Sequence, residues 1–338
     1  MWRCVVSTLV LNRDSLCVSL EGRHLVVRDH AAEGNLQRLP LVDVDRVIVA
    51  GQPAISFRVL AHLMDRRIPC SFLTHGGRWR GMMDGDYGFH AGRRILQYER
   101  MRDGDFAVQL ARQLAAAKIS NCRRSLQRLA AERGESLADE PEWRLLAGLL
   151  GGLAMAKSTD AVRGIEGAAA NGYFKLLGRF FSKDAPFERR SRRPPRNPAN
   201  ALMSFVYALL ENEFSGAIRA HGLDVAGGFL HKGIDRSPAL ALDLMEPFRP
   251  MLADRLTINL LNHRRILADR HFEEVAEGGF HLTADGRGIV FRAFDEMMNR
   301  RVASECGRVT IRQLIDREVC RFIGMLEGKE PIRFHHAA

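Results

Sequence analysis

The fold is decided by residues 93–133, RRILQYERMRDGDFAVQLARQLAAAKISNCRRSLQRLAAER, where the character of the sequence changes. This stretch is rich in Ala, Leu, Gln and Arg, which are favourable in helices, and it predicts long helical structure with a polar face. Helical patterns dominate from there toward the end of the chain. The sequence therefore predicts a large all-α domain over residues 92–330.

The residues before this stretch have the alternating pattern of β-strands. Residues 15–29 are typical of a hairpin, residues 46–51 of a buried strand, and residues 54–67 of a short amphipathic helix with Ile55 on its apolar side. A strand at IPCSFLT and a glycine turn at HGGRWRGMM follow. We expect an α+β chain, with residues 1–91 forming a small N-terminal β-rich domain.

The composition favours a polyanionic partner. Fifty Lys and Arg oppose forty Asp and Glu, giving a net charge of +10 and a pI near 9.8, and nucleic acid is the commonest such partner. The longest uncharged apolar run has twelve residues, whereas a membrane-spanning helix needs about 20. Six scattered cysteines form no C-x-x-C pair, which favours a reduced cytoplasmic protein without a disulfide framework or zinc motif.

Two acids interrupt an apolar helix in residues 229–250, FLHKGIDRSPALALDLMEPFRP. Asp243 and Glu246 are three residues apart and share one helix face. A buried carboxylate needs a cation, and Arg249 could supply it. The alternative is a ladder of alternating charges on a solvated face. Ser237 is expected to be the N-cap of this helix, with Pro238 as its first residue.

Two further residues could act together with these acids. Glu166 lies beside the apolar stripe of a predicted helix and is flanked by two glycines, which indicates a close approach to the backbone. His231 follows a glycine pair upstream of Asp243. Each has an ordinary structural interpretation, as a boundary glutamate or a core histidine. Together, one imidazole and two or three carboxylates are a ligand set for Mg²⁺ or Mn²⁺.

An arginine-rich loop, ERRSRRPPRNP at residues 188–198, lies between these candidates. The planar guanidinium suits phosphate recognition, so we predict DNA binding here, although a solvated charge run is the simpler interpretation. The predicted DNA-binding residues are Arg189, Arg190, Arg192, Arg193 and Arg196, with Arg249.

Four segments resemble, in order, the patterns of the universal CRISPR-associated integrase, the spacer-acquisition endonuclease family. They are VRGIEGAAANGYF, RSRRPPRNPANALMSFVY, GFLH and PALALDLMEPFRP. The resemblance covers residues 1–330. It implies a β-rich N-terminal domain, a helical catalytic domain and a homodimer. It also implies a small ferredoxin-like partner, which joins two such dimers into a heterohexamer. The sequences RSRRPP and ALDLMEPFRP resemble those of family members that work beside an iron–sulfur exonuclease.

The same resemblance implies roles for individual residues. Glu166, His231 and Glu246 would be the metal ligands, Asp243 would lie close by, and Tyr173 would be near the reacting strand. We also expect the N-terminal domain to make the homodimer contact.

The implied reaction is metal-dependent insertion of short foreign DNA into the CRISPR array, by attack of a 3′-hydroxyl on a phosphodiester. The absence of a G-x-x-x-x-G-K-[ST] motif agrees with a reaction that needs no ATP. The alternatives are a structure-specific nuclease acting on branched DNA in repair, and a basic DNA-binding scaffold without catalysis.

Overall fold

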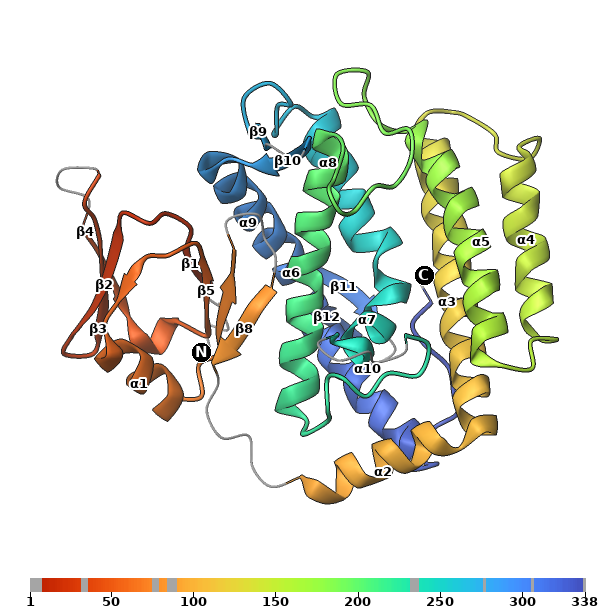
Figure 1. Cartoon of the computed structure of the whole chain (residues 1–338), viewed down its shortest axis with the longest axis horizontal. Coiled ribbons are helices and arrows are strands. Elements are labelled where there is room, and N and C mark those ends of the chain that lie inside the picture. The colour runs from red at the N-terminus through yellow and green to blue at the C-terminus, as the bar shows by residue number, and fades with distance from the viewer. Residues whose placement is uncertain are drawn as a thin grey trace.

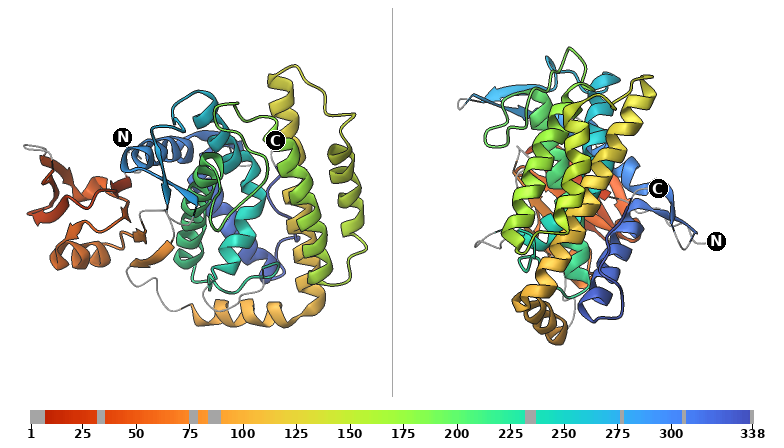
Figure 2. Two further views of the ribbon diagram at one scale, coloured as in Figure 1. Left: turned by 45° about the horizontal axis from the view of Figure 1, so that its top comes forward. Right: turned by 90° about the vertical axis from the view of Figure 1, so that its right-hand side faces the viewer.

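The computed structural model (Figure 1) describes the chain in seven stretches. These are residues 8–31, 36–74, 79–83, 90–231, 237–275, 278–304 and 307–336. A strand-rich region comes first and projects to one side of a larger helical region, as Figures 1 and 2 show. The predicted fold class is thus confirmed, whereas the exact division into domains at residue 91 stays a prediction.

The strand-rich region contains two four-stranded sheets. One has the order β1 (Thr8–Leu11), β5 (Arg46–Ala50), β7 (Cys70–Leu73) and β8 (Trp79–Met83). The other has the order β4 (Leu36–Pro40), β3 (His24–Asp29), β2 (Leu16–Glu21) and β6 (Ala54–Ile55). The predicted hairpin is β2 and β3, paired antiparallel, and its turn contains Gly22 at φ +59°, a conformation that glycine adopts without strain. The predicted glycine turn before β8 lies outside the described residues.

The predicted amphipathic helix is shorter than expected. Helix α1 spans Phe57–Asp65, because Ser56 caps it by accepting a hydrogen bond from the backbone of Val59. Ile55, which periodicity assigned to the helix, lies in β6 instead and pairs with Val18 of β2. Because Ile55 pairs in the sheet, it is not part of α1.

The helical region surrounds one large core. Its helices are α2 (Ala91–Arg102), α3 (Gly104–Glu132), α4 (Pro141–Leu153), α5 (Thr159–Gly178), α6 (Pro198–Ala220), α7 (Ala239–Met245), α8 (Arg255–Asn262), α9 (Ala284–Asn299) and α10 (Ile311–Leu326). It also holds two hairpins, which the sequence did not predict. They are β9 (Phe272–Val275) with β10 (Gly279–Leu282), and β11 (Arg301–Ser304) with β12 (Gly307–Thr310).

The long helical stretch of residues 93–133 is two helices. Asp103 has extended backbone angles, and its side chain caps α3 by accepting from the N–H of Phe106. In Figure 1, α2 crosses the lower edge of the molecule and α3 rises from its end. This turn directs α3 through the centre of the helical region, where it contacts α5, α4 and the segment after α7.

The two regions share side chains and polar contacts. Ile48, Ala50 and Leu73 of the first sheet belong to the same core as the helices. Arg46 forms an ion pair with the buried Glu213 of α6, and Ser71 donates a hydrogen bond of 2.9 Å to Asn212. The first sheet is thus packed on the helical region. None of the described helices is long and apolar enough to cross a membrane.

Candidate metal centre

Three charged side chains from distant parts of the chain meet between α3, α5 and the end of α7. Lys118 of α3 contacts Glu166 of α5, and its Nζ lies 2.6 Å from Oε2 of Glu246. Their side chains are 11%, 19% and 2% exposed. The structure therefore brings together the two acids that the sequence proposed as ligands, around a lysine that it did not propose.

Lys118 could have been found from its position. Leu114 and Cys122, one turn before and after it on α3, are buried, so the lysine lies on an apolar stripe. A lysine is almost never buried without a partner. Burial alone would lower the pKa of Lys118, but Glu246 and Glu166 outweigh it and raise the pKa. The ammonium is therefore charged.

Asp243 fixes the third candidate ligand, His231. Its carboxylate accepts hydrogen bonds from the backbone N–H groups of Phe229, Leu230 and His231, at 2.5, 2.9 and 2.8 Å. Its Oδ1 also lies 2.7 Å from Nδ1 of His231. In the tautomer in which Nδ1–H donates to this carboxylate, Nε2 keeps its lone pair. Nε2 faces Glu246, with 3.8 Å to Oε1.

The helix that carries both acids begins one residue later than expected. Pro238, and not Ser237, occupies the N-cap position, and no side chain caps the helix. The carbonyl of Pro238 instead accepts the first helical hydrogen bond, from Leu242 at 2.9 Å. Helix α7 ends at Met245, and Glu246 opens a 3-10 turn with Pro247.

The acids of α7 are buried, so the interpretation as a solvated charge ladder is wrong. Asp243 and Glu246 are each 1% exposed, and Arg249 is 8% exposed. Arg249 does form an ion pair with Glu246. Burial by itself would raise the pKa of Glu246, but Arg249, Lys118 and His231 outweigh it and lower the pKa to about 2. Glu246 is therefore ionised at neutral pH.

Tyr173 lies beneath this cluster, with its hydroxyl already engaged. It donates to Asp254 at 2.7 Å, and Tyr207 donates to the other oxygen of Asp254 at 2.5 Å. Burial raises the pKa of Asp254 to about 6, although both hydrogen bonds oppose the rise. The guanidinium of Arg249 lies 4.6 Å from the centre of the Tyr207 ring, which links this layer to Glu246.

The arginines predicted to bind DNA have two different environments. Arg190 is partly buried and donates to Asn200 and Ser204, at 2.9 and 3.0 Å, so it braces its own loop, as Arg249 braces Glu246. The exposed members are Arg189, Arg192, Arg193 and Arg196. Of these, Arg196 also donates to the carbonyl of Gly278 at 3.2 Å.

The donor set fits a divalent cation. Carboxylates of Glu166 and Glu246 and the free nitrogen of His231 match Mg²⁺ or Mn²⁺. Oε2 of Glu246 is buried, and its close partner is the ammonium of Lys118 at 2.6 Å, so the protein already places a positive charge at this oxygen. Among the described residues, the donor atoms of these three ligands are not all within 4.8 Å of one another, although Nε2 of His231 lies 3.8 Å from Oε1 of Glu246. The ammonium of Lys118 lies between the two acids, so a cation would take its place.

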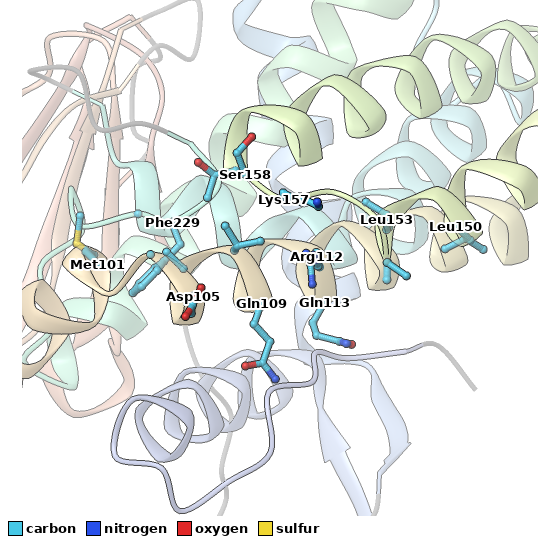
Figure 3. Close-up of a pocket in the computed structure, with 17 residues that line it drawn as sticks. Met101, Asp105, Gln109, Arg112, Gln113, Leu150, Leu153, Lys157, Ser158 and Phe229 are labelled. Atoms are coloured by element: carbon cyan, nitrogen blue, oxygen red, sulfur yellow. The ribbon is translucent and has the colours of Figure 1, made fainter.

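A groove follows α3 and reaches the loop that carries His231. It has a volume of about 1460 Å³ and is lined by residues of α3, by the start of α5 and by Phe229. Figure 3 shows Gln109, Arg112 and Lys157 along it. The Nε of Arg112 donates to the carbonyl of Ala156 at 2.8 Å, which holds the segment before α5 against α3.

Comparisons with known proteins give one consistent result. A family model described as CRISPR associated protein Cas1 matches residues 9–296. A CRISPR-associated endonuclease Cas1 of Chlorobaculum tepidum is 33% identical over 297 residues, which cover 86% of each chain. A Cas4 exonuclease/Cas1 endonuclease fusion of Geobacter sulfurreducens is 32% identical, over 93% of this chain and 57% of the fusion. The solved Cas1 protein of Thermotoga maritima has a TM-score of 0.81 and 25% identity, covering 98% of this chain and all of that one.

Proposed function

The chain belongs to the Cas1 family of CRISPR-associated proteins, and on that premise we propose that it is a metal-dependent DNA endonuclease and integrase of CRISPR adaptation. The observation that supports this most is the convergence of Glu166, Glu246 and His231 around one cationic position. Glu166 and His231 are 65 positions apart in the sequence, and His231 and Glu246 are 15 apart, so no local sequence contact explains why they lie close together. A shared ligand provides a reason.

Mg²⁺ or Mn²⁺ at this position would orient a phosphate and neutralise charge that develops on its oxygens. The chain's own residues prepare the site for it. The low pKa of Glu246 keeps that ligand ionised. Asp243 holds His231 with Nε2 available. Burial of Glu246 and the layer beneath it keeps the ligands rigid.

The proposed reaction is a transesterification. The 3′-oxygen of a short DNA fragment bonds to a phosphorus at the boundary of the repeat, and the phosphorus–oxygen bond to the target strand's own 3′-oxygen breaks. The proton lost by the attacking hydroxyl is balanced by one gained by the released 3′-hydroxyl. One phosphodiester replaces another, so no nucleotide is consumed. With water as the nucleophile, the same centre would hydrolyse DNA.

The proposed partners follow from charge and from the relatives. A net charge of +10 and the exposed loop arginines favour double-stranded DNA. The fusion relative carries Cas4 and Cas1 in one protein, which supports a functional link to an iron–sulfur exonuclease for this chain. We further propose a homodimer formed through the strand-rich region, a small ferredoxin-like partner that joins two such dimers into a heterohexamer, and a location in the cytoplasm of a prokaryote.

Ligand substitutions test the proposal directly. Glu166→Ala, His231→Ala and Glu246→Ala should each abolish joining of linear DNA to a plasmid target while leaving DNA binding nearly intact, because affinity comes from phosphate contacts and not from the metal. Glu142→Ala, on the neighbouring face of α4, is the matched control and should retain activity. Near wild-type strand transfer by any ligand variant would remove that residue from the ligand set.

The two alternative functions give other results. A repair nuclease would cleave branched DNA in the presence of metal but would not join ends to a plasmid. A non-catalytic scaffold would bind DNA without binding Mn²⁺ at Glu166 and Glu246. Asp243→Asn should weaken metal binding by about 10- to 100-fold without abolishing it, because this residue acts through His231.

A further inference from the structure

Three potential metal ligands meet away from this centre, where the end of α6 packs on α10. His221 follows the last residue of α6, and Asp316 and Cys320 are four residues apart on α10, so they share a helix face. Nε2 of His221 lies 2.8 Å from Oδ1 of Asp316 and 3.5 Å from Sγ of Cys320. Within the part of the chain that the structure describes, this is the one group of such side chains with donor atoms all within 4.8 Å.

We propose that His221, Asp316 and Cys320 form a second metal site, selective for Zn²⁺ or a cation of similar softness. A thiolate and an imidazole favour Zn²⁺ and disfavour Mg²⁺. The shared nitrogen is the main argument. A proton on Nε2 can serve only one of its two neighbours well, whereas a cation placed beside Nε2 would bind both the carboxylate and the thiolate.

The distances are close to those of a tetrahedral site. With bonds of about 2.0–2.3 Å, ligand atoms of such a site lie about 3.3–3.6 Å apart. The nitrogen–sulfur distance of 3.5 Å already agrees. The nitrogen–oxygen distance of 2.8 Å must widen by about half an ångström, which Asp316 allows because its side chain is 55% exposed. The exposure also leaves room for water as a fourth ligand.

The backbone holds His221 in this position. Its N–H bonds to the carbonyl of Ala217 at 3.1 Å, and its own carbonyl accepts from Arg93 of α2. The next residue, Gly222, has φ +73° and lies so close to His90 that a Cβ would overlap that side chain. Only glycine fits there, so the end of α6 is fixed against α2.

Burial and Asp316 raise the pKa of the Cys320 thiol, and the nearby charge of Arg93 opposes that rise.

A metal here would connect α6 to α10. Nothing in the sequence indicated it, because its donors are separated by 95 and 4 residues and match no zinc spacing. The site shares no residue with the Glu166–His231–Glu246 centre, so its existence does not depend on the proposed function.

Cobalt tests the site, because a Co²⁺–thiolate bond absorbs in the near ultraviolet whereas carboxylate and imidazole ligands do not. The reduced, chelator-treated full-length protein should develop this absorption on titration with Co²⁺ and lose it when Zn²⁺ is added. Cys320→Ser should abolish the band, and Asp316→Asn should weaken Co²⁺ binding at least tenfold. Zn²⁺ should also raise the thermal midpoint of the wild type more than that of Cys320→Ser.

Two controls separate this site from other sources of the signal. Cys17→Ser, which removes a cysteine of the strand-rich region, should keep the band. Glu246→Ala should keep it as well, because that ligand belongs to the other centre. A wild type without a thiolate band would overturn the proposal, as would a band that survives in Cys320→Ser.

Discussion

Replacing Lys118 by methionine should make the protein less stable without metal and should strengthen metal binding. Methionine keeps the unbranched aliphatic stem but removes the ammonium that lies between Glu166 and Glu246. In the metal-free protein, two carboxylates then face each other with less compensation. When a metal binds to the wild type, the ammonium of Lys118 must leave this position, and its ion pairs with Glu166 and Glu246 are lost. The variant has no such ion pairs, so metal binding does not have to break them.

The structure sets the size of both effects. Removing one partner of a buried ion pair costs about 3–5 kcal/mol, and the lower end applies because Arg249 still pairs with Glu246. A loss of about 3 kcal/mol lowers the thermal midpoint by roughly 6–12 °C in a region of this size. The ammonium contacts both acids, so its displacement should cost at least about 1.4 kcal/mol, which corresponds to a tenfold gain in Mn²⁺ affinity for the variant.

Titration calorimetry with Mn²⁺ and thermal unfolding with and without Mn²⁺ measure these quantities. Saturating Mn²⁺ should restore most of the lost stability, because a ligand that binds only the folded state stabilises it. Lys175→Met is the matched control, since Lys175 also pairs with a glutamate but at the surface, where it is 72% exposed. It should change neither quantity.

Two results would refute this reasoning. Weaker Mn²⁺ binding in Lys118→Met would mean that the ammonium assists the metal instead of occupying its position. Unchanged affinity together with unchanged stability would mean that the ion pairs contribute nothing. A wild type that binds no Mn²⁺ at all would count against the proposed function and not against the role of Lys118.

Three further predictions concern DNA binding, pH and assembly. Replacing the exposed loop arginines by glutamine should make the slope of the logarithm of duplex affinity against the logarithm of salt concentration shallower, by about 0.9 for each phosphate that the loop no longer neutralises. Arg190→Gln should leave this slope unchanged. Binding curves at several salt concentrations decide between DNA binding by the loop and a solvated charge run. The pKa of Asp254 is raised in the native state. Between about pH 4 and pH 6, Asp254 is therefore protonated in the native state and ionised in the unfolded state. The free energy of unfolding should fall as the pH rises through this window. Asp254→Asn should remove about 2 kcal/mol of the fall between pH 4.5 and pH 7, and urea unfolding at these two pH values would show it. Phe57 is 77% exposed in the strand-rich region and should be needed for dimerisation, so Phe57→Glu should sediment as a monomer. Met155 is equally exposed on the helical region, and the control Met155→Glu should sediment as a dimer. A dimeric Phe57→Glu would count against an interface at this face.

Local signals in the sequence predicted much of the fold. Alternation indicated the β2–β3 hairpin, and the residues rich in Ala, Leu, Gln and Arg indicated helical structure over α2 and α3. The division at Asp103 was not predicted, because helix-forming residues on both sides hid a single extended residue. The β9–β10 and β11–β12 hairpins were also missed, since strands of four residues carry little periodicity.

The candidate site was predictable only in part. The motifs indicated Glu166, His231 and Glu246, and the structure places them around one cluster. Neither motif nor periodicity indicated that Lys118 would lie between the acids, or that Arg190 would turn inward to Asn200. Both depend on contacts between segments far apart in sequence, and a side chain's partner in such a contact is set by the packing of whole helices.

The packing of the first sheet on the helices has a consequence for how the protein is made. Arg46 is translated 167 residues before its partner Glu213, and at about 5–20 residues per second it waits on the ribosome for roughly 8–30 seconds. During that time the sheet that carries Ile48, Ala50 and Leu73 lacks α6, whose Asn212 and Glu213 contact it in the folded protein. The growing chain thus presents an incomplete apolar sheet face to chaperones or to neighbouring nascent chains. Slower translation should therefore lower the soluble yield, and early capture of this face by a holdase should recover it.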